Sequence, residues 1–168
     1  GSFIAVVIYF YKDIANFFQN RILFFKIFIS SLPVMVIGFF LVESGTIEKI
    51  RNLETIAWTT TIFGILLYLS DKFKLKNEIK NNFTYKSAIF IGFFQVLSLI
   101  PGVSRSGIAI TAARLLNFKR TDSAKISFLL SIPALSGASF LGLKDIVNQP
   151  VELNYLVLVA IISSFILS

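Results

Sequence analysis

Long apolar runs separated by short charged connections make up most of the chain. Residues 22–42 are almost entirely apolar, and they are long enough to cross a bilayer as one helix, which takes about 20 residues. Residues 55–70 and residues 123–143 form two further apolar runs of helical length. The pattern therefore predicts an all-α fold, a polytopic membrane helix bundle.

The apolar runs at the two ends of the chain are too short to cross a bilayer. Residues 2–11 have the character of a helix end, and residues 153–168 that of a helix beginning. Pro33 and Gly38, inside the first long run, predict a kink or a close helix contact. We expect residues 1–168 to form a single integral membrane domain that belongs to a longer one.

Two shorter apolar runs, residues 87–100 and 108–116, flank the polar segment Pro-Gly-Val-Ser-Arg-Ser-Gly at residues 101–107. The proline lacks an N–H group and ends the first helix, while Gly102 and Gly107 allow backbone angles that a Cβ would forbid. Both runs are too short to span, which predicts a re-entrant pair of broken helices with its loop near mid-membrane. Irregular backbone is tolerated at that depth where it lines a cavity.

This loop carries the groups of an anion site. Ser104 and Ser106 are candidate N-caps for the following helix, whose first turn offers free N–H groups and the positive end of the dipole. Arg105 adds a planar fork that suits phosphate oxygens. The alternative is a helix break whose arginine reaches an interface, but a cationic loop between apolar runs is costly enough to favour a functional role.

Composition supports a membrane protein and narrows the chemistry. The chain is 55% hydrophobic, with a mean hydropathy of +0.79, whereas soluble domains are about 45–50% apolar. Its net charge of +7 lies mainly in the connections, most densely in residues 71–86. The positive-inside rule explains this pattern without a nucleic-acid partner and makes residues 71–86 cytoplasmic. The chain has no Cys and no His, which removes disulfides and the commonest acid/base group at neutral pH.

The loop also resembles a known signature. Residues 101–107 are similar to the PGxSRSG motif of the bacterial undecaprenyl-pyrophosphate phosphatases of the bacitracin-resistance type. Residues 1–14, Gly-Phe-Phe-Gln at 92–95 and Phe-Leu-Leu-Ser-Ile-Pro-Ala at 128–134 fit the same family, so the resemblance covers nearly the whole chain. Ala109 departs from the pattern, because the family usually carries Thr there.

The resemblance implies a phosphoric anhydride hydrolase that converts undecaprenyl diphosphate to undecaprenyl phosphate and phosphate, recycling the lipid carrier of cell-wall synthesis. It implies a multi-pass protein of the bacterial cytoplasmic membrane, with the lipid diphosphate and the bilayer as partners. The implied catalytic residues are Arg105, Ser104 and Ser106. The residues implied to bind the substrate's phosphates are Gly102, Val103, Gly107 and Gln95. An interhelical hydrogen bond is the alternative for Gln95, and the sequence leaves a homodimer open.

The resemblance also implies a divalent metal ion, Mg²⁺ or Ca²⁺. Its ligands would lie in an N-terminal Glu-x-x-x-Glu motif followed by Ser-Ser-x-x-His, and nothing in this chain matches that pattern. Asp71, at a helix end, is interpreted as structural, and Thr111 as a packing or backbone-bonding residue. We therefore assign no metal ligand here and expect one half of an active site, which alone binds phosphate weakly and hydrolyses little.

Two other functions fit the same pattern. A transporter or lipid flippase could use a broken helix to hold an anionic head group, and the weak likeness of residues 22–70 to residues 123–168 would suit an inverted repeat. The chain could also be an inactive helical scaffold.

Overall fold

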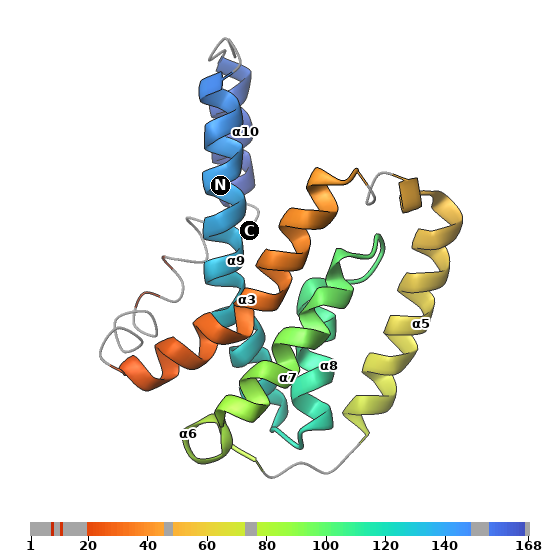
Figure 1. Cartoon of the computed structure of the whole chain (residues 1–168), viewed down its shortest axis with the longest axis vertical. Coiled ribbons are helices and arrows are strands. Elements are labelled where there is room, and N and C mark those ends of the chain that lie inside the picture. The colour runs from red at the N-terminus through yellow and green to blue at the C-terminus, as the bar shows by residue number, and fades with distance from the viewer. Residues whose placement is uncertain are drawn as a thin grey trace. The chain divides into compact units, whose positions relative to one another are not determined.

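The computed structural model describes most of the chain. The described residues are Ile8, Tyr11 and the ranges 20–45, 49–72, 77–148 and 155–166. They form helices joined by short connections, and within these ranges the only bridge-type pairing joins Asn77 and Phe118. The predicted all-α class is confirmed (Figure 1). The elements are α3 (Arg21–Glu43), α5 (Leu53–Asp71), α6 (Ile79–Asn82), α7 (Tyr85–Val96), η1 (Leu97–Leu99), α8 (Arg105–Leu115), α9 (Arg120–Asn148) and α10 (Tyr155–Ile166).

Two of these helices are long and apolar enough to cross a membrane. They are α3, over the 21 residues Arg21–Leu41, and α5, over the 19 residues Leu53–Asp71. Both were predicted from the apolar runs. Helix α9 covers the third predicted run, and α10 lies within the C-terminal one; whether they cross a bilayer stays a prediction. The N-terminal run falls almost wholly outside the described residues.

The chain divides into two compact units. One contains residues 25–131, and the other contains residues 1–24 and 132–168. The predicted loop lies in the first unit, together with α5, α7 and α8, and the description below concerns this unit. That the whole chain forms one membrane domain stays a prediction.

The broken helix pair is confirmed. Helices α7 and α8 lie side by side with the loop joining them at one end (Figure 1). They contain 12 and 11 residues. At a rise of about 1.5 Å per residue, each is about 16–18 Å long, roughly half of a hydrocarbon core of about 30 Å. A re-entrant pair needs helices of this length, while the depth of its loop in the membrane stays a prediction.

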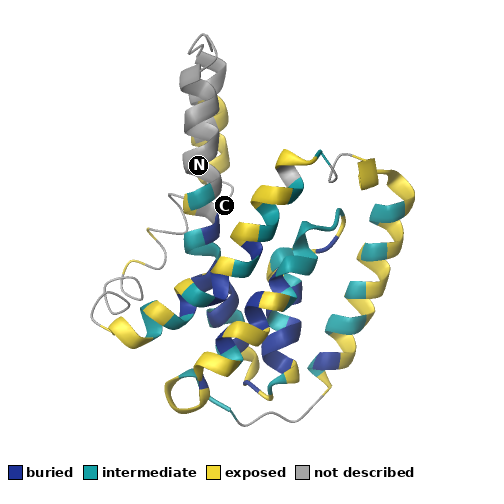
Figure 2. Cartoon of the chain, in the orientation of Figure 1, coloured by how far each residue is buried: buried dark blue, intermediate teal, exposed yellow. Residues whose placement is uncertain are grey.

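Small residues let the helices of this unit pack closely. Ala109, Ala112 and Ala113 of α8 are fully buried, and buried positions gather on α8 and its neighbours in Figure 2. At Gly92 of α7, an added Cβ would lie 2.4 Å from the carbonyl oxygen of Ser30 in α3. The Ala109 side chain is therefore part of the helix packing.

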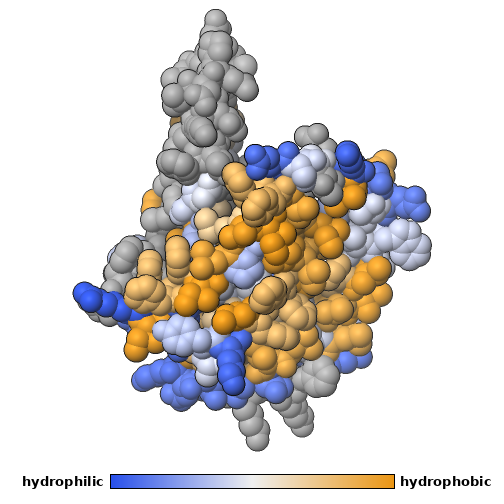
Figure 3. Space-filling view, in the orientation of Figure 1, coloured by the Kyte–Doolittle hydropathy of each residue, from blue (hydrophilic) through white to orange (hydrophobic). Residues whose placement is uncertain are grey.

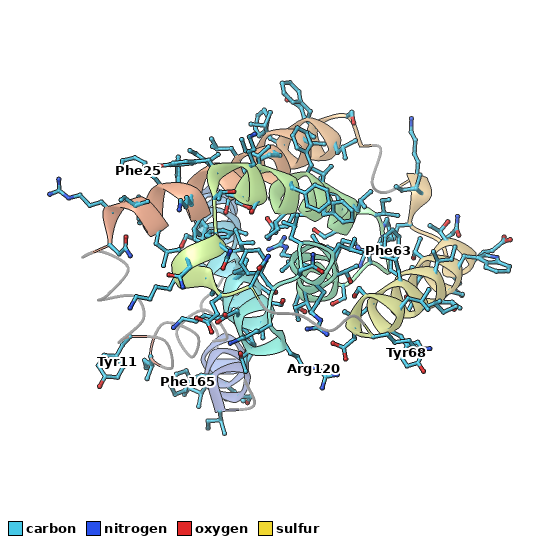
Figure 4. The ribbon with its side chains drawn as sticks, turned by 90° about the horizontal axis from the view of Figure 1, so that it is seen from below. Tyr11, Phe25, Phe63, Tyr68, Arg120 and Phe165 are labelled. Carbon is cyan, nitrogen blue, oxygen red and sulfur yellow. The ribbon has the colours of Figure 1, made fainter. Side chains whose placement is uncertain are left out.

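The outer face of the unit is apolar. Figure 3 shows a broad hydrophobic band between hydrophilic rims. In Figure 4, Phe63 of α5 lies toward α8, whereas Tyr68 points outward. Ser70 is the buried residue of α5, so most of that helix presents its side chains to the surroundings, as expected for a helix in lipid. The exposed large hydrophobic side chains of α3, α5 and α7 include Phe28, Val36, Phe39, Phe40, Trp58, Ile62, Ile65 and Phe93.

A polar cluster ties α5 to α8 and α9 at the end away from the loop. Asp71 forms an ion pair with Arg114, in which Arg114 Nη2 lies 2.9 Å from Asp71 Oδ1, and a second ion pair with Arg120. Arg114 is only 6% exposed, and it also donates to the backbone oxygen of Asp71 at 2.8 Å. The predicted structural role of Asp71 is therefore confirmed.

A second ion pair lies beside this cluster, between Glu78 and Lys119. The hydrogen bond and charge of Lys119 lower the pKa of Glu78, and Glu78 in turn raises the pKa of Lys119. The backbone of Asn77 pairs with the same turn, since its N–H donates to Asn117 O at 2.9 Å and its oxygen accepts from Lys119 N at 3.0 Å. The segment before α6 and the turn between α8 and α9 are therefore joined by backbone hydrogen bonds and an ion pair.

Two local predictions are wrong. Helix α8 begins at Arg105, so Arg105 and Ser106 belong to its first turn rather than to the loop. Gly107 lies inside this helix without a positive φ, because the turn that requires glycine closes earlier, at Gly102. Arg114 lies near the end of the same helix and is buried, with Asp71 as its ion-pair partner.

Candidate functional site

The loop is a compact turn between η1 and α8. The N–H of Ile100 donates to Leu97 O and the N–H of Val103 donates to Ile100 O, both at 3.1 Å. Gly102 has a φ of +93°, a value that L side chains rarely adopt. The prediction that Gly102 needs special backbone angles is confirmed, and this glycine turns the chain back toward the start of α8.

Helix α5 lies directly against this turn. A Cβ at Gly102 would lie 2.3 Å from Thr59 Oγ1 and 2.8 Å from Ile56 O. The hydroxyl of Thr59 donates to Pro101 O at 2.6 Å, and that of Thr60 donates to Gly102 O at 3.0 Å. Glycine is therefore required at residue 102 both for its backbone angle and for the close approach of α5.

Ser104 starts α8. It has extended backbone angles, and its Oγ accepts the N–H of Gly107 at 3.2 Å, as an N-cap does. Of the two predicted candidates for this cap, Ser104 is the cap, and Ser106 lies in the first turn with its Oγ 3.2 Å from Ser104 Oγ. Ser127 of α9 donates to Ser106 O at 3.3 Å, so a second helix holds this turn.

The first turn of α8 keeps hydrogen-bond donors free. Within the described part of the chain, the backbone N–H groups of Arg105 and Ser106 have no hydrogen-bond partner. The Arg105 side chain is partly buried, and across the same ranges its guanidinium makes no ion pair or hydrogen bond. Arg114 and Arg120, in contrast, both bind Asp71. An uncommitted guanidinium beside free amides at a helix N-terminus is suited to binding an anion.

The other predicted residues lie farther inside the protein. Gln95 is 1% exposed, and its Oε1 has no hydrogen-bond partner among the described residues. Val103 is buried, and its N–H is already bonded to Ile100 O. Thr111 is 1% exposed and donates to Gly107 O at 2.8 Å, which confirms its backbone-bonding role. The phosphate-binding roles of Gln95, Val103 and Gly107 stay predictions.

The described residues do not form a metal site. Within the described ranges, no group of three or more His, Cys, Asp or Glu side chains could hold a metal ion. The carboxylates in these ranges that make ion pairs, Asp71 and Glu78, do so with basic side chains near the far end of the helix pair. No hydrogen bond within the same ranges joins Ser104 or Ser106 to a carboxylate.

Comparison with known proteins shows the family of the chain. The family described as "Bacitracin resistance protein BacA" matches residues 1–168. The chain therefore belongs to the BacA family. A relative named undecaprenyl-diphosphatase, from Pelagibacter ubique, is 50% identical over all of this chain and 66% of the relative. Proteins of the same name from Roseobacter denitrificans and Dinoroseobacter shibae are 34% and 39% identical, over 89% and 86% of this chain and 61% and 59% of their own length.

The chain covers less than two thirds of the length of each of these BacA relatives. Family membership, together with the two apolar helices, identifies the chain as a membrane protein.

Sequence reasoning missed the residues of α5 at this site. Thr59 and Thr60 belong to a run of three threonines, residues 59–61, inside an apolar segment. Polar side chains within a membrane helix commonly bond to a neighbouring helix or mark a functional site, so this run was the available signal. Which element the run faces could not be predicted from the sequence.

Proposed function

We propose that this chain provides the diphosphate-binding part of an undecaprenyl-diphosphatase. The observation that carries the proposal is the uncommitted Arg105 guanidinium beside the free amides at the N-terminus of α8. A diphosphate presents several anionic oxygens, and a guanidinium fork with backbone N–H groups matches them in charge and geometry. The names of the BacA relatives supply the substrate.

In this proposal each group of the first turn has a separate task. Arg105 and the free amides neutralise the charge of the phosphates, including the charge that develops as the terminal phosphoryl group leaves. The Ser104 oxygen already accepts the N–H of Gly107, and one of the Ser104 and Ser106 hydroxyls donates to the other, so this pair keeps one O–H to donate to a phosphate oxygen.

The described residues do not supply the groups that would activate the attacking atom. A serine nucleophile would need a base within hydrogen-bonding reach, and Ser104 and Ser106 have none there. We propose that the divalent ion of the family and its ligands belong to other parts of the site, and no step above depends on them.

The lipid part of the substrate fits the surroundings of the loop. The exposed apolar side chains of α3, α5 and α7 would contact bilayer lipid, and a polyprenyl chain could lie along the same surfaces. We propose a multi-pass protein of the bacterial cytoplasmic membrane, with the basic connections next to α6 and before α9 on the cytoplasmic side.

The experiment is a binding measurement in detergent with undecaprenyl diphosphate. We expect Arg105→Ala to lower the affinity roughly 10- to 100-fold, because a hydrogen bond to a charged group contributes about 1.5–3 kcal/mol. Arg105→Lys should restore the affinity only in part, since an ammonium lacks the fork.

The matched control is Lys86→Ala, which removes one positive charge from an exposed side chain at the start of α7, away from the loop. It should leave the affinity unchanged. Equal losses for Arg105→Ala and Lys86→Ala would mean that only overall charge attracts the lipid. An unchanged affinity for Arg105→Ala would overturn the proposal.

A further inference from the structure

We propose that Thr59 and Thr60 of α5 are positioning residues of the diphosphate site, which hold the carbonyl groups of Pro101 and Gly102 toward α5 and so direct the loop amide of Gly102 toward the anion. The inference rests on the proposed function, because it assigns a task within the same site.

The first observation is that each hydroxyl is matched to one loop carbonyl. Thr59 Oγ1 lies 2.6 Å from Pro101 O, and Thr60 Oγ1 lies 3.0 Å from Gly102 O. Neither carbonyl accepts another hydrogen bond from the described part of the chain. The two threonines are therefore the groups that fix the orientation of these carbonyls.

Thr59 also has two possible acceptors in its own helix, which could compete for its single hydroxyl hydrogen. Its Oγ1 is 2.8 Å from Thr55 O and 3.2 Å from Ile56 O, both longer than the distance to Pro101 O. The carbonyls of a helix interior also accept backbone N–H groups of the following turn. Pro101 O depends on the hydroxyl, while the helix carbonyls do not.

The second step concerns the peptide group between Pro101 and Gly102. In a planar trans peptide, the C=O and the N–H point in opposite directions. Because Pro101 O is held toward α5, the N–H of Gly102 points away from α5. This N–H has no partner within the described ranges. The Thr59 hydrogen bond thus leaves the N–H of Gly102 as a free donor that points away from α5, in addition to the free amides of Arg105 and Ser106.

The third step is electrostatic. A carbonyl oxygen that faced the site would repel a phosphate and weaken its binding. The hydroxyls of Thr59 and Thr60 bind two loop carbonyl oxygens and hold them toward α5. The contacts from α5 thus take up two carbonyl oxygens next to the site, while the amides stay available to an anion.

The chain offers a matched control in the next residue. Thr61 donates only to Ala57 O of its own helix, at 2.8 Å, and is exposed. Thr→Val at residues 59, 60 or 61 makes the same chemical change in one helix, since a methyl group replaces a hydroxyl. Only the first two changes remove a hydrogen bond to the loop.

The test measures the affinity of the whole chain in detergent for farnesyl diphosphate, together with hydrogen exchange of the amides of residues 102–107. We expect Thr59→Val and Thr60→Val each to lower the affinity about 3- to 10-fold, in line with the loss of one hydrogen bond. Exchange at residues 102–107 should become faster in both. Thr59→Ser should restore both readouts, and Thr61→Val should match the wild type. A melting temperature close to the wild-type value shows that the variants fold.

The outcomes separate this inference from the proposed function. If the wild-type chain binds and all three valine variants bind equally well, the positioning role is overturned and the diphosphate site stands. The role is also overturned if Thr61→Val causes the same loss as Thr59→Val, because the effect then belongs to α5 as a whole. If the wild-type chain does not bind the diphosphate, the proposed function fails and the inference fails with it.

Discussion

Gly102 is the residue at which the loop and α5 constrain each other most tightly. Its φ of +93° turns the chain toward α8, and its missing side chain lets Thr59 and Ile56 approach. Arg105 follows three residues later with its guanidinium uncommitted within the described ranges. At the scale of single residues, the site therefore combines Gly102, a position that tolerates no Cβ, with Arg105, a side chain that is available to bind an anion.

We expect Gly102→Ala to destabilise the chain and to weaken diphosphate binding. The left-handed backbone alone costs an alanine about 1–2 kcal/mol, and the added Cβ would also collide with Thr59 Oγ1 at 2.3 Å. Thermal melting in detergent measures the loss of stability. The matched control is Gly64→Ala on α5, where an added Cβ meets nothing within 4 Å and helix propensity favours alanine. A melting temperature for Gly102→Ala as high as that of Gly64→Ala would contradict this account.

At the scale of elements, α5 is attached to α8 and its flanking loop at both ends. Thr59 and Thr60 hold the loop at the N-terminus of α8, and Asp71 holds Arg114 near its C-terminus. Between these points the buried alanines of α8 permit close packing. Because α5 buries so little of its own surface, the polar contacts at its two ends decide where it lies against α8.

We expect Asp71→Asn to destabilise the chain by roughly 2–4 kcal/mol, because removing one partner leaves the buried Arg114 charge uncompensated. The side chain of Asp71 is 26% exposed, which limits the loss. Arg120→Ala removes the other ion pair of Asp71 from a side chain that is 78% exposed, so it should cost less than about 1 kcal/mol. Comparison of the two melting curves is the measurement, and equal losses would mean that the burial of Arg114 does not matter.

At the scale of the whole molecule, the described residues combine an apolar outer surface with one polar loop that suits an anion. Among these described residues, no group of three or more His, Cys, Asp or Glu side chains could bind a metal ion. The chain also covers only 66% of its Pelagibacter ubique relative. We therefore interpret the chain as binding machinery whose chemistry depends on further residues.

We expect the chain alone to release little phosphate from undecaprenyl diphosphate in detergent. Joining it to the part of the Pelagibacter ubique relative that it does not match should raise the rate, because the activating groups are then supplied. Arg105→Ala in the joined protein should lower that rate about 100-fold or more, as loss of one preorganised donor does elsewhere. Rapid hydrolysis by the 168-residue chain alone would show that the division of the site is wrong.

Much of this protein could be predicted from its sequence. The apolar runs predicted the helical class and located α3 and α5, since helix length and hydrophobicity are local properties of the chain. Pro101, Gly102 and Ser104 predicted the break and the cap for the same reason, because proline, positive φ and N-capping act within a few residues.

The tertiary structure decided which groups are committed to partners. Arg105 and Arg114 are both arginines beside apolar runs, and only the packing of α5 shows that Arg114 is occupied by Asp71 whereas Arg105 is not. The contact of Thr59 with Pro101 joins residues 42 positions apart, and no local pattern specifies it. A partner across such a distance depends on how helices pack, which is why the sequence located the loop and the fold determined what holds it.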